Sequence, residues 1–327
     1  MRSKGQNWSA ERRLKRLADL QRGDLHGHCA DALRRVVIFG VNDVQIRPGM
    51  VAAPRWDARQ PDPGPRESGP PLPLISRLIA ARGMAMRLYL TALYEAQVRQ
   101  RPGSVHTNER QLWPFSSDDI GWVGLLATTA TVTANGRSEM GNRLRQIKSA
   151  IERLVNEGGV ILPNATRPRN KFEHFLLSRD VATPPGLPVE ERYVTPRRNE
   201  GISIPVQFYT NNWLHCLTDS EIALWLSLRL LAKEYPDAHS DTGIYMPDNT
   251  RRYRFGLTRD AYESHTMLRY FGLIRGVDNE SRWRAGRSAS LRERGRVEPL
   301  HFVLNDRALS ASAVDVVSAI LQQYQLE

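Results

Sequence analysis

The chain has 327 residues, of which 41% are hydrophobic, and a formal net charge of +11. This length exceeds a usual single domain, so two domains and a smaller element are expected, with enough apolar residues for buried cores. The positive charge favours a polyanionic partner, for which nucleic acid and an anionic membrane surface are the two candidates.

The sequence also excludes several classes of protein. It has no run of about 18 apolar residues, and roughly the first 25 residues are too charged for a signal peptide. The only cysteines, Cys29 and Cys216, are far apart in sequence, which gives neither a disulfide framework nor a thiolate zinc site. We therefore expect a cytoplasmic protein that binds no membrane and no cofactor.

The N-terminal segment, residues 1–47, is predicted to be basic and helical. Leu14, Leu17 and Ala18 share one face of an amphipathic helix over residues 10–20, and a second helical run covers residues 29–39. The only local group of metal-type ligands, His26, His28 and Cys29, precedes the second run. Side chains two residues apart on a helix point about 200° apart, and no second cluster supplies further ligands, so we expect a surface turn and no metal site.

Residues 48–73 contain eight prolines among Arg, Asp, Gly and Ser. This composition favours extended backbone and cannot bury a core, so it predicts a linker. The following apolar pattern, from residue 72 to about residue 100, predicts one or two helices with a break near Gly83. Ser116 or Ser117 can then cap a short helix over residues 118–127.

The next helix, predicted over residues 138–157, has two different faces. One face is apolar and is expected to be buried, with Met140, Leu144, Ile147, Ile151 and Leu154. The opposite face is polar, with Asn142, Arg145, Gln146, Ser149 and Arg153. Gly158 and Gly159 end the helix, and strands over residues 160–162 and 172–177 flank a basic turn that carries Arg167, Arg169 and Lys171.

After a second Pro-containing linker, residues 181–204, a similar unit is predicted over residues 205–306. Thr218 and Glu221 form a capping box that opens an apolar helix to Glu234. A strand over residues 243–246 and a short helix over residues 247–253 follow. A helix over residues 258–271 comes next, capped by Thr258 and ended by Gly272, and strands begin at residues 273 and 300.

This second unit carries most of the positive charge. Residues 251–296 contain twelve Arg and no Lys against five acids, which is +7 of the formal +11. The guanidinium fork suits phosphate oxygens and guanine edges, and a basic loop beside a helix with a polar outer face is typical of duplex binding. A solvated surface loop would have the same composition, and the neighbouring helix favours the first interpretation.

Both units share one order of elements: short helix, helix with a polar face, Gly stop, strand, basic turn and strand. The run Asn142-Arg143-Leu144-Arg145-Gln146-Ile147, continued to Leu154 and followed by Gly158-Gly159-Val160-Ile161-Leu162, resembles the recognition helix and first wing strand of winged-helix DNA-binding proteins. Residues 218–274 resemble a second copy. Paired winged helices in one chain are similar to plasmid replication initiators of the Rep type. The resemblance covers residues 72–306 and rests on pattern.

The resemblance implies a mainly α fold with small β-hairpin wings (α+β): two winged helix-turn-helix domains, 74–180 and 205–306, after an N-terminal helical segment. It implies a nucleoid-associated protein that binds double-stranded DNA sequence-specifically, as a transcriptional regulator or an initiator of plasmid DNA replication, reading the major groove with helices 138–157 and 258–271. The residues expected to bind DNA are Asn142, Arg145, Gln146, Ser149, Arg153, Arg167, Arg169, Lys171, Arg251, Arg252, Arg259, Tyr262, Thr266, Arg269, Arg282, Arg284 and Arg287.

Other interpretations are kept beside this one. Basic surfaces that bind backbone without discriminating bases would make an architectural protein. No nuclease, hydrolase or phosphate-loop motif is present, so no enzyme is expected, and no aromatic stacking platform for RNA is found. The C-terminal segment, residues 307–327, predicts a helix whose apolar stripe either covers the second domain or pairs with a second copy in a homodimer. We expect the cover.

Overall fold

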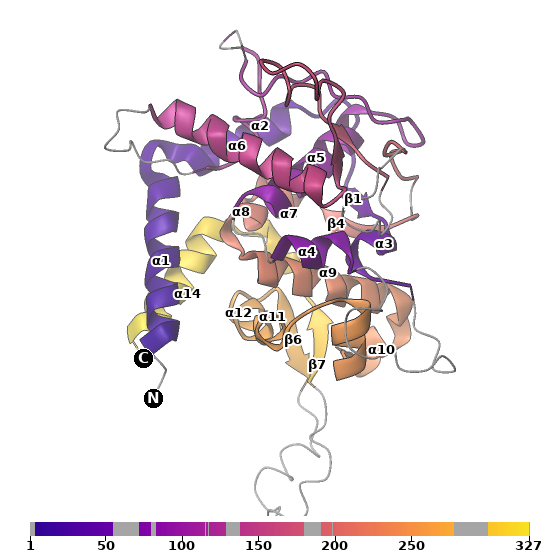
Figure 1. The fold of residues 1–327 in the computed structure, drawn as a ribbon. Coiled ribbons are helices and arrows are strands. Elements are labelled where there is room, and N and C mark those ends of the chain that lie inside the picture. Colours follow the sequence, from indigo (N-terminus) through magenta and orange to yellow (C-terminus); the bar gives the residue numbers. More distant parts are fainter. Residues whose placement is uncertain are drawn as a thin grey trace, which may run out of the picture.

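The computed structural model describes residues 4–54, 72–79, 83–114, 116, 118–128, 138–179, 191–197, 199–277 and 300–326. Within these residues the protein is mainly helical, with small antiparallel sheets (Figure 1). The predicted class, mainly α with some β, is therefore confirmed. None of the described helices is long and apolar enough to cross a bilayer.

The elements of the N-terminal half are α1 (Lys4–Gln21), η1 (Arg22–Asp24), α2 (Leu25–Arg35), β1 (Asp43–Ile46), α3 (Pro48–Val51), α4 (Leu74–Ile79), α5 (Ala85–Arg99), α6 (Glu139–Asn156), β2 (Val160–Ile161) and β3 (Leu176–Leu177). Those of the C-terminal half are β4 (Ile202–Pro205), α7 (Gln207–Thr210), α8 (Trp213–Cys216), α9 (Asp219–Glu234), α10 (Pro236–Asp241), β5 (Ile244–Tyr245), η3 (Thr250–Arg254), α11 (Arg259–Glu263), α12 (His265–Tyr270), β6 (Ile274–Val277), β7 (His301–Leu304), η4 (Asp306–Ser310) and α14 (Ala313–Leu326).

Helix α1 lies beside α14, so the first and last helices of the chain are neighbours (Figure 1). Leu17 and Leu20 are buried, and Arg13 Nη1 donates to Glu221 Oε1 over 2.8 Å. Helix α14 packs against α8 as well. The apolar stripe is therefore buried within the chain, against α8 of the second predicted unit and against α1, which lies outside that unit. A homodimer stays a prediction.

Helix α2 begins earlier than predicted because Asp24 caps it, with its carboxylate accepting from Gly27 N over 3.3 Å. The group of His26, His28 and Cys29 therefore lies within a helix and not in a surface turn. Cys29 is buried, and its Sγ lies 3.4 Å from Nε2 of His215. No group of metal-type ligands able to hold an ion is found among the described residues.

Strands β1 and β4 form an antiparallel ribbon, with Gln45 opposite Ser203 and Ile46 opposite Ile202. Val44, Ile46, Ile202 and Ile204 lie in the core, so the ribbon buries its apolar face. The pairing joins the predicted N-terminal segment to residues of the second predicted linker. One cluster of buried apolar side chains also extends from Ala10 to Leu321. The division into separate domains stays a prediction.

The first predicted linker is not extended throughout. Its first residues form α3, a short helix with Pro48 at its start, and Met50 and Val51 are buried. After residue 72 the apolar pattern forms two helices, α4 and α5, rather than one. Gly83 lies in the region between them with a φ of +135°, a conformation that glycine tolerates.

Residues 118–127 do not form the predicted short helix. Trp122 N donates to Gln111 O over 3.0 Å and Val123 N to Leu112 O over 3.2 Å, so the backbone pairs with an earlier segment. A Cβ at Gly121 would lie 2.6 Å from Cδ of Pro114, which shows how close the two segments come. Tertiary pairing has replaced the local helix.

Strands β2 and β3 pair as predicted, but they are shorter, and residues 163–174 between them form successive turns. A third stretch pairs on the other side. Tyr193 N donates to Leu177 O over 3.0 Å, and His106 N donates to Tyr193 O over 2.7 Å. Residues 192–194, predicted as linker, therefore complete this small sheet.

The predicted capping box of α9 is confirmed. Thr218 Oγ1 accepts from Glu221 N over 3.2 Å, and Glu221 accepts from Thr218 N over 2.7 Å. Helix α9 is buried along most of its length and packs against α4, α11 and α12. Phe208 stacks on Trp225 at 4.7 Å between ring centroids, which ties α7 to this central helix.

The sheet that follows α9 has the order β5-β7-β6, with β7 antiparallel to both neighbours. The predicted helix over residues 258–271 is interrupted, since α11 ends at Glu263 and α12 begins at His265. Gly272 has a φ of +75°, and Leu273 N donates to Leu268 O over 3.0 Å, so the predicted glycine stop is confirmed. The short second helix is a π-helical turn, η3.

Candidate nucleic-acid interface

Helix α6 crosses the upper part of the molecule in Figure 1 and packs against α5. Ser138 caps it, with Oγ accepting from Gly141 N over 3.1 Å. Ile147, Ile151 and Leu154 are fully buried. These contacts fix which face of the helix is left in solvent.

The exposed face of α6 carries Arg145 and Ser149, and Gln146 is half-buried. Two predictions about which side chains of α6 are buried are wrong. Asn142 is only 3% exposed, so it cannot reach a base without a shift of the helix, whereas Met140 is 50% exposed and not part of the core.

Arg143 holds the beginning of α6 in place, a role that the sequence did not suggest. Its Nε donates to Thr128 Oγ1 over 2.9 Å, and its Nη2 donates to Val123 O over 3.0 Å. Burial lowers the pKa of this guanidinium group. Arg143 is therefore a positioning residue for the helix.

Arg153, expected to bind DNA, is already paired. Its Nη2 lies 2.8 Å from Glu157 Oε1, and the other oxygen of Glu157 lies 3.4 Å from Nη1 of Arg77. The pair stabilises the end of α6 and partly neutralises Arg153. Arg153 would have to leave Glu157 to reach a phosphate, so it is a weaker candidate than Arg145.

The turns after β2 fold back onto α6. Lys171 Nζ lies 3.4 Å from Glu152 Oε1 and 4.9 Å from the ring centroid of Phe172. Glu173 accepts from Leu112 N over 2.9 Å, which anchors the base of the turns. The sequence-predicted helix and basic turn are thus brought together on one surface.

Arg167 and Arg169 lie in these turns and are exposed. Neither forms an ion pair with a carboxylate of the described residues. Together with Arg145 they are three cations for which the described part of the chain offers no carboxylate partner. We call this region the α6 surface: Arg145, Ser149, Arg167, Arg169 and Lys171. Unpaired cations of this kind are suited to phosphate oxygens.

The second predicted surface lies on α11 and α12. Thr258 Oγ1 caps α11 by accepting from Ala261 N over 3.2 Å. Arg259, 84% exposed, forms an exposed pair with Glu263 at 3.3 Å, and Thr266 is exposed. Tyr262 is half-buried, with its ring centroid 5.2 Å from that of His265. It supports the helix pair more than it projects from it.

Arg269 is exposed and lies across strand β6. A Cβ at Gly276 would lie 3.0 Å from Cζ of Arg269, so the guanidinium group rests directly on this glycine. The missing side chain of Gly276 leaves the room that the Arg269 side chain occupies. The contact joins the second helix to the strand that leads into residues 278–299.

Arg251 was predicted to contact DNA from the second surface, but the structure buries it. Arg251 is only 9% exposed, and its Nη1 donates to Leu257 O over 2.5 Å while its Nε donates to Asp248. This hydrogen bond lowers the pKa of the Asp248 carboxyl group. Arg251 therefore holds the turn before α11. The adjacent Arg252 is 55% exposed, and its only ion pair among the described residues, with the exposed Asp248, is long at 3.9 Å, so it is the better candidate to meet a ligand.

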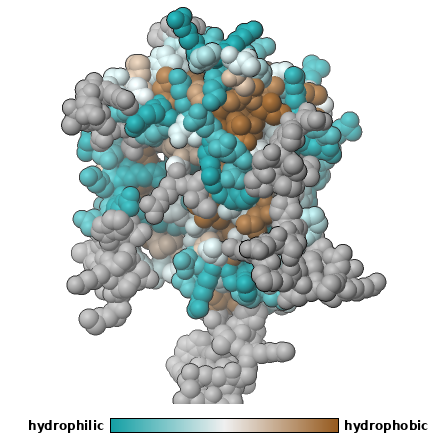
Figure 2. All heavy atoms as spheres, in the orientation of Figure 1, coloured by the Kyte–Doolittle hydropathy of each residue, from teal (hydrophilic) through white to brown (hydrophobic). Residues whose placement is uncertain are grey.

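Arg282, Arg284 and Arg287 lie outside the described residues. The second surface therefore consists of Arg252, Arg259, Thr266 and Arg269, which we call the α11–α12 surface. In Figure 1 it lies in the lower part of the molecule, with α4 and α9 between it and α6. The face of the molecule seen in Figure 2 is mostly hydrophilic, with apolar side chains gathered in its upper part.

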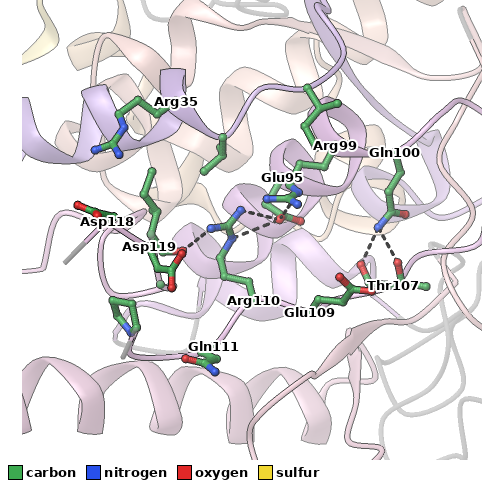
Figure 3. A pocket seen from close by; sticks show the side chains of 15 residues that line it. Arg35, Glu95, Arg99, Gln100, Thr107, Glu109, Arg110, Gln111, Asp118 and Asp119 are labelled. Atoms are coloured by element: carbon green, nitrogen blue, oxygen red, sulfur yellow. Dashed lines mark hydrogen bonds and ion pairs between the residues drawn. The ribbon is translucent and has the colours of Figure 1, made fainter. Parts of the chain in front are cut away.

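A separate cleft of about 650 Å³ has walls of both signs of charge (Figure 3). At its base the buried Glu95 accepts from Arg110 Nε over 3.2 Å, and burial raises the pKa of this carboxyl group although Arg110 opposes the shift. Glu109, Asp118 and Asp119 are exposed at the cleft. The exposed Arg35 and Arg99 line the same cleft, so its charge is mixed and we do not count it with the two basic surfaces.

Comparison with known proteins does not assign the chain to a family. A scan against models of protein families found no matching family, and searches of curated proteins and of solved structures found no match either.

Proposed function

We propose that the protein binds double-stranded DNA sequence-specifically, with the α6 surface and the α11–α12 surface each entering the major groove. The order of elements in the second unit carries the proposal. Strand β6 follows the helix pair, and β7 then returns to the centre of the sheet, between β5 and β6. Helix, strand, connecting segment and returning central strand are what a winged helix-turn-helix domain needs.

The first unit supports the same proposal with two differences. Helix α6, strand β2, a basic turn and strand β3 keep the expected order, but residues 118–127 do not form the short helix expected before α6, and residues 192–194 take the position beside β3. The side chains suit the two parts of DNA recognition. Arg145 and Ser149 offer donors for base edges, and Arg167 and Arg169 offer cations for phosphates.

We infer one of two biological roles, a transcriptional regulator or an initiator of plasmid replication. Two separate reading helices fit either role, because each requires an extended site on the duplex. A regulator would occupy a promoter and alter its transcription. An initiator would bind repeated sites near an origin and support replication of a plasmid that carries them.

Mapping of binding sites in the source genome tests the proposal. We expect a limited number of sites with a shared sequence, and purified protein should bind that sequence far more tightly than random duplex of equal length. Broad occupancy without a shared sequence would favour the architectural alternative, in which basic surfaces contact backbone alone. Absence of binding to any duplex at low salt would overturn the proposal.

A further inference from the structure

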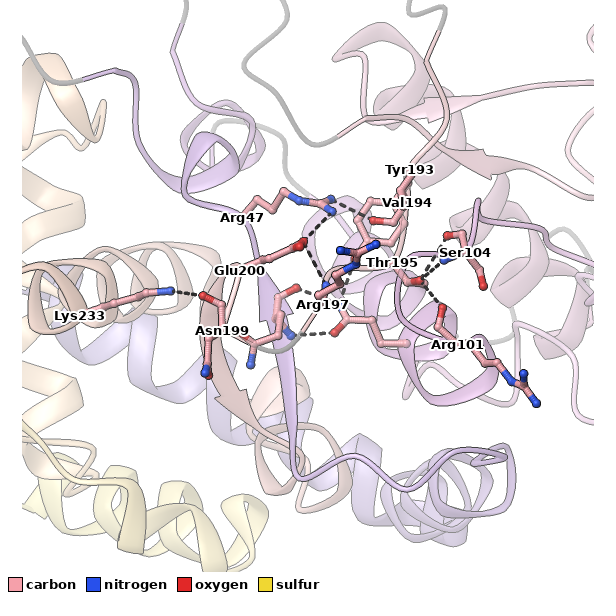
Figure 4. A network of polar contacts seen from close by, with 12 residues as sticks. Arg47, Arg101, Ser104, Tyr193, Val194, Thr195, Arg197, Asn199, Glu200 and Lys233 are labelled. Carbon is pink, nitrogen blue, oxygen red and sulfur yellow. Dashed lines mark hydrogen bonds and ion pairs between the residues drawn. The ribbon is translucent and has the colours of Figure 1, made fainter.

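Two further pockets of the molecule differ in what they offer a ligand. The larger, of about 400 Å³, lies beside the β1–β4 ribbon, and Figure 4 shows the polar contacts of one of its walls. Thr195 Oγ1 donates to Arg101 O over 2.6 Å, and Lys233 Nζ donates to Asn199 O over 3.0 Å. Because these groups bind one another, the larger pocket singles out no ligand. The smaller pocket has walls of a different kind.

The smaller pocket, of about 260 Å³, lies between the end of α9, helix α10, strand β5 and the η3 turn. Apolar and aromatic side chains form most of its walls: Leu231, Tyr235, Ile244, Tyr245, Pro247 and His301. Tyr235 and Tyr245 are each 47% exposed, so two large rings of this pocket are in contact with solvent. A cavity of about 150 Å³ is enough for benzene, so this pocket has room for a molecule of one or two fused rings.

The strand register brings two of these rings together. Ile244 pairs with Phe302 and both are buried, so the next pair, Tyr245 and His301, projects from the other face of the sheet. The two rings stack with 5.1 Å between their centroids and 25° between their planes. A further aromatic ring placed beside this pair would gain from burial and from offset stacking.

The hydrogen bonds of His301 indicate what else the ligand needs. Its Nδ1 lies 3.1 Å from Thr242 O and 3.2 Å from Gly243 O. Carbonyl oxygens only accept, so Nδ1 carries the hydrogen, and in the neutral ring Nε2 is an acceptor. Nε2 has no partner among the described residues. A ligand that donates an N–H or O–H group to Nε2 would satisfy it.

The pocket offers no free cation to a ligand. Arg254 is the one permanently charged side chain among the described residues that line it. Its Nη1 donates to Glu234 Oε2 over 2.8 Å, and its Nη2 donates to Glu234 Oε1. Both side chains are mostly buried, at 12% and 17% exposed. Because the guanidinium fork is already occupied by a carboxylate, the pocket favours a neutral ligand over an anion.

We propose that this pocket binds a small neutral aromatic molecule that carries an N–H or O–H donor. The ring of the ligand stacks beside Tyr245 and His301, and its donor binds Nε2 of His301. Tyr235 and Pro247 cover the rest of the ring. None of the four residues of the α11–α12 surface lines the pocket, so this binding requires no DNA.

Calorimetric titration of the full chain with indole and with benzofuran tests the proposal. The two molecules have nearly the same shape, but benzofuran has an oxygen atom where indole has its N–H group. We expect indole to bind about fivefold more tightly, because benzofuran leaves the His301 acceptor without a donor. Indole-3-carboxylate should bind more weakly than indole, since Arg254 is already paired. Equal binding of indole and benzofuran, tighter binding of the carboxylate, or no binding of indole at millimolar concentration would overturn the proposal.

Variants locate the site. Tyr245→Ala removes one of the stacked rings and should lower the affinity for indole about fivefold. The matched control is Tyr270→Ala, which changes a similarly exposed tyrosine of α12 outside the pocket and should leave the affinity unchanged. His301→Phe keeps a ring beside Tyr245 but has no acceptor, so it should remove the preference for indole over benzofuran.

Circular dichroism checks that each variant is folded. If folded Tyr245→Ala keeps the affinity of the parent, or folded His301→Phe keeps its preference for indole, the ligand binds elsewhere and the proposal fails. DNA takes no part in these measurements, so this proposal and the proposal of DNA binding fail independently.

Discussion

Lys171 Nζ lies 3.4 Å from Glu152 Oε1, which attaches the turns after β2 to the outer face of α6. Both side chains are more than one third exposed, so solvent and salt screen the pair, and its contribution to stability is at most about 1 kcal/mol. A phosphate can therefore replace Glu152 as the partner of Lys171 at little cost. The Lys171–Glu152 pair thus keeps the basic turn beside α6, but it is weak enough to break when DNA binds.

Arg145→Ala tests readout by α6. Arg145 is exposed and makes no ion pair with the described residues, so its removal should not disturb the fold. If it contacts a base edge, the affinity for the cognate site should fall by about 1–3 kcal/mol, with a smaller loss on random duplex. Fluorescence anisotropy with both DNAs measures the difference. Arg22→Ala, on the exposed η1 turn, is the control, and equal losses on both DNAs would contradict base readout.

Arg167→Ala and Arg169→Ala test the contact of the turns with phosphates. Each lost phosphate contact should lower the slope of log affinity against log salt by about 0.9, because fewer counterions are released on binding. The loss of affinity should be the same on cognate and random duplex, since phosphates carry no base identity. An unchanged slope in both variants would exclude the turns from the interface.

A triple variant, Arg282, Arg284 and Arg287 to Ala, tests the segment between β6 and β7. If this segment contacts the duplex, the salt slope should fall by more than in either single variant of the first unit. Circular dichroism checks that the variant is folded. A folded variant that keeps the parent's slope would remove this segment from the DNA interface, and the α11–α12 surface would then rely on Arg252, Arg259 and Arg269.

Arg251→Ala and Arg252→Ala separate a structural arginine from an exposed one. Loss of Arg251 leaves the buried Leu257 carbonyl with one partner fewer, so the free energy of unfolding should fall by about 1–3 kcal/mol. Loss of Arg252 should change it by less than about 0.5 kcal/mol. Urea unfolding measures both, and DNA affinity corrected for the folded fraction should fall only for Arg252→Ala. If Arg251→Ala instead lowered the DNA affinity without lowering the free energy of unfolding, Arg251 would be part of the DNA interface.

Because His106 is buried, we expect the protein to lose stability in mild acid. The His106 side chain is fully buried, and burial lowers its pKa from 6.5 to about 4, while its Nδ1 accepts from Leu177 N. The unfolded chain takes up the proton first as the pH falls below about 6.5. The free energy of unfolding should therefore decrease by up to roughly 3 kcal/mol between pH 7 and pH 4, and it should not depend on this histidine above pH 7. Urea unfolding of the parent and of His106→Gln between pH 7 and pH 4.5 should show a smaller pH dependence in the variant. If the free energy of unfolding depended on pH equally in the parent and in His106→Gln, His106 would not be the cause of the acid sensitivity.

Elements with a local signal were predictable from the sequence. Thr218 with Glu221, Thr258 and Gly272 are helix caps and stops whose partners lie within a few residues, and each is formed as expected. The alternation of apolar and polar residues also located α6 and the edge carrying Arg145 and Ser149.

What depends on distant parts of the chain was not predictable. Residues 118–127 have a helical pattern, but Gln111 and Leu112 take their backbone donors. Asn142, which periodicity places on the polar face of its helix, is buried, and so is Arg251, which was expected to contact DNA. The pairing of β1 with β4 joins residues about 160 apart, for which a sequence pattern holds no register information.

The β1–β4 ribbon has a consequence for the integrity of the protein. Residues 43–46 are held by residues 202–205 and by the side chain of Gln97, and α1 is held by α14 and by Glu221. A chain cleaved once within residues 55–71 would therefore remain a single particle, with its first fifty or so residues retained by non-covalent contacts. Proteolytic nicking there would cut the polypeptide without releasing a fragment, and the two pieces would separate only on unfolding.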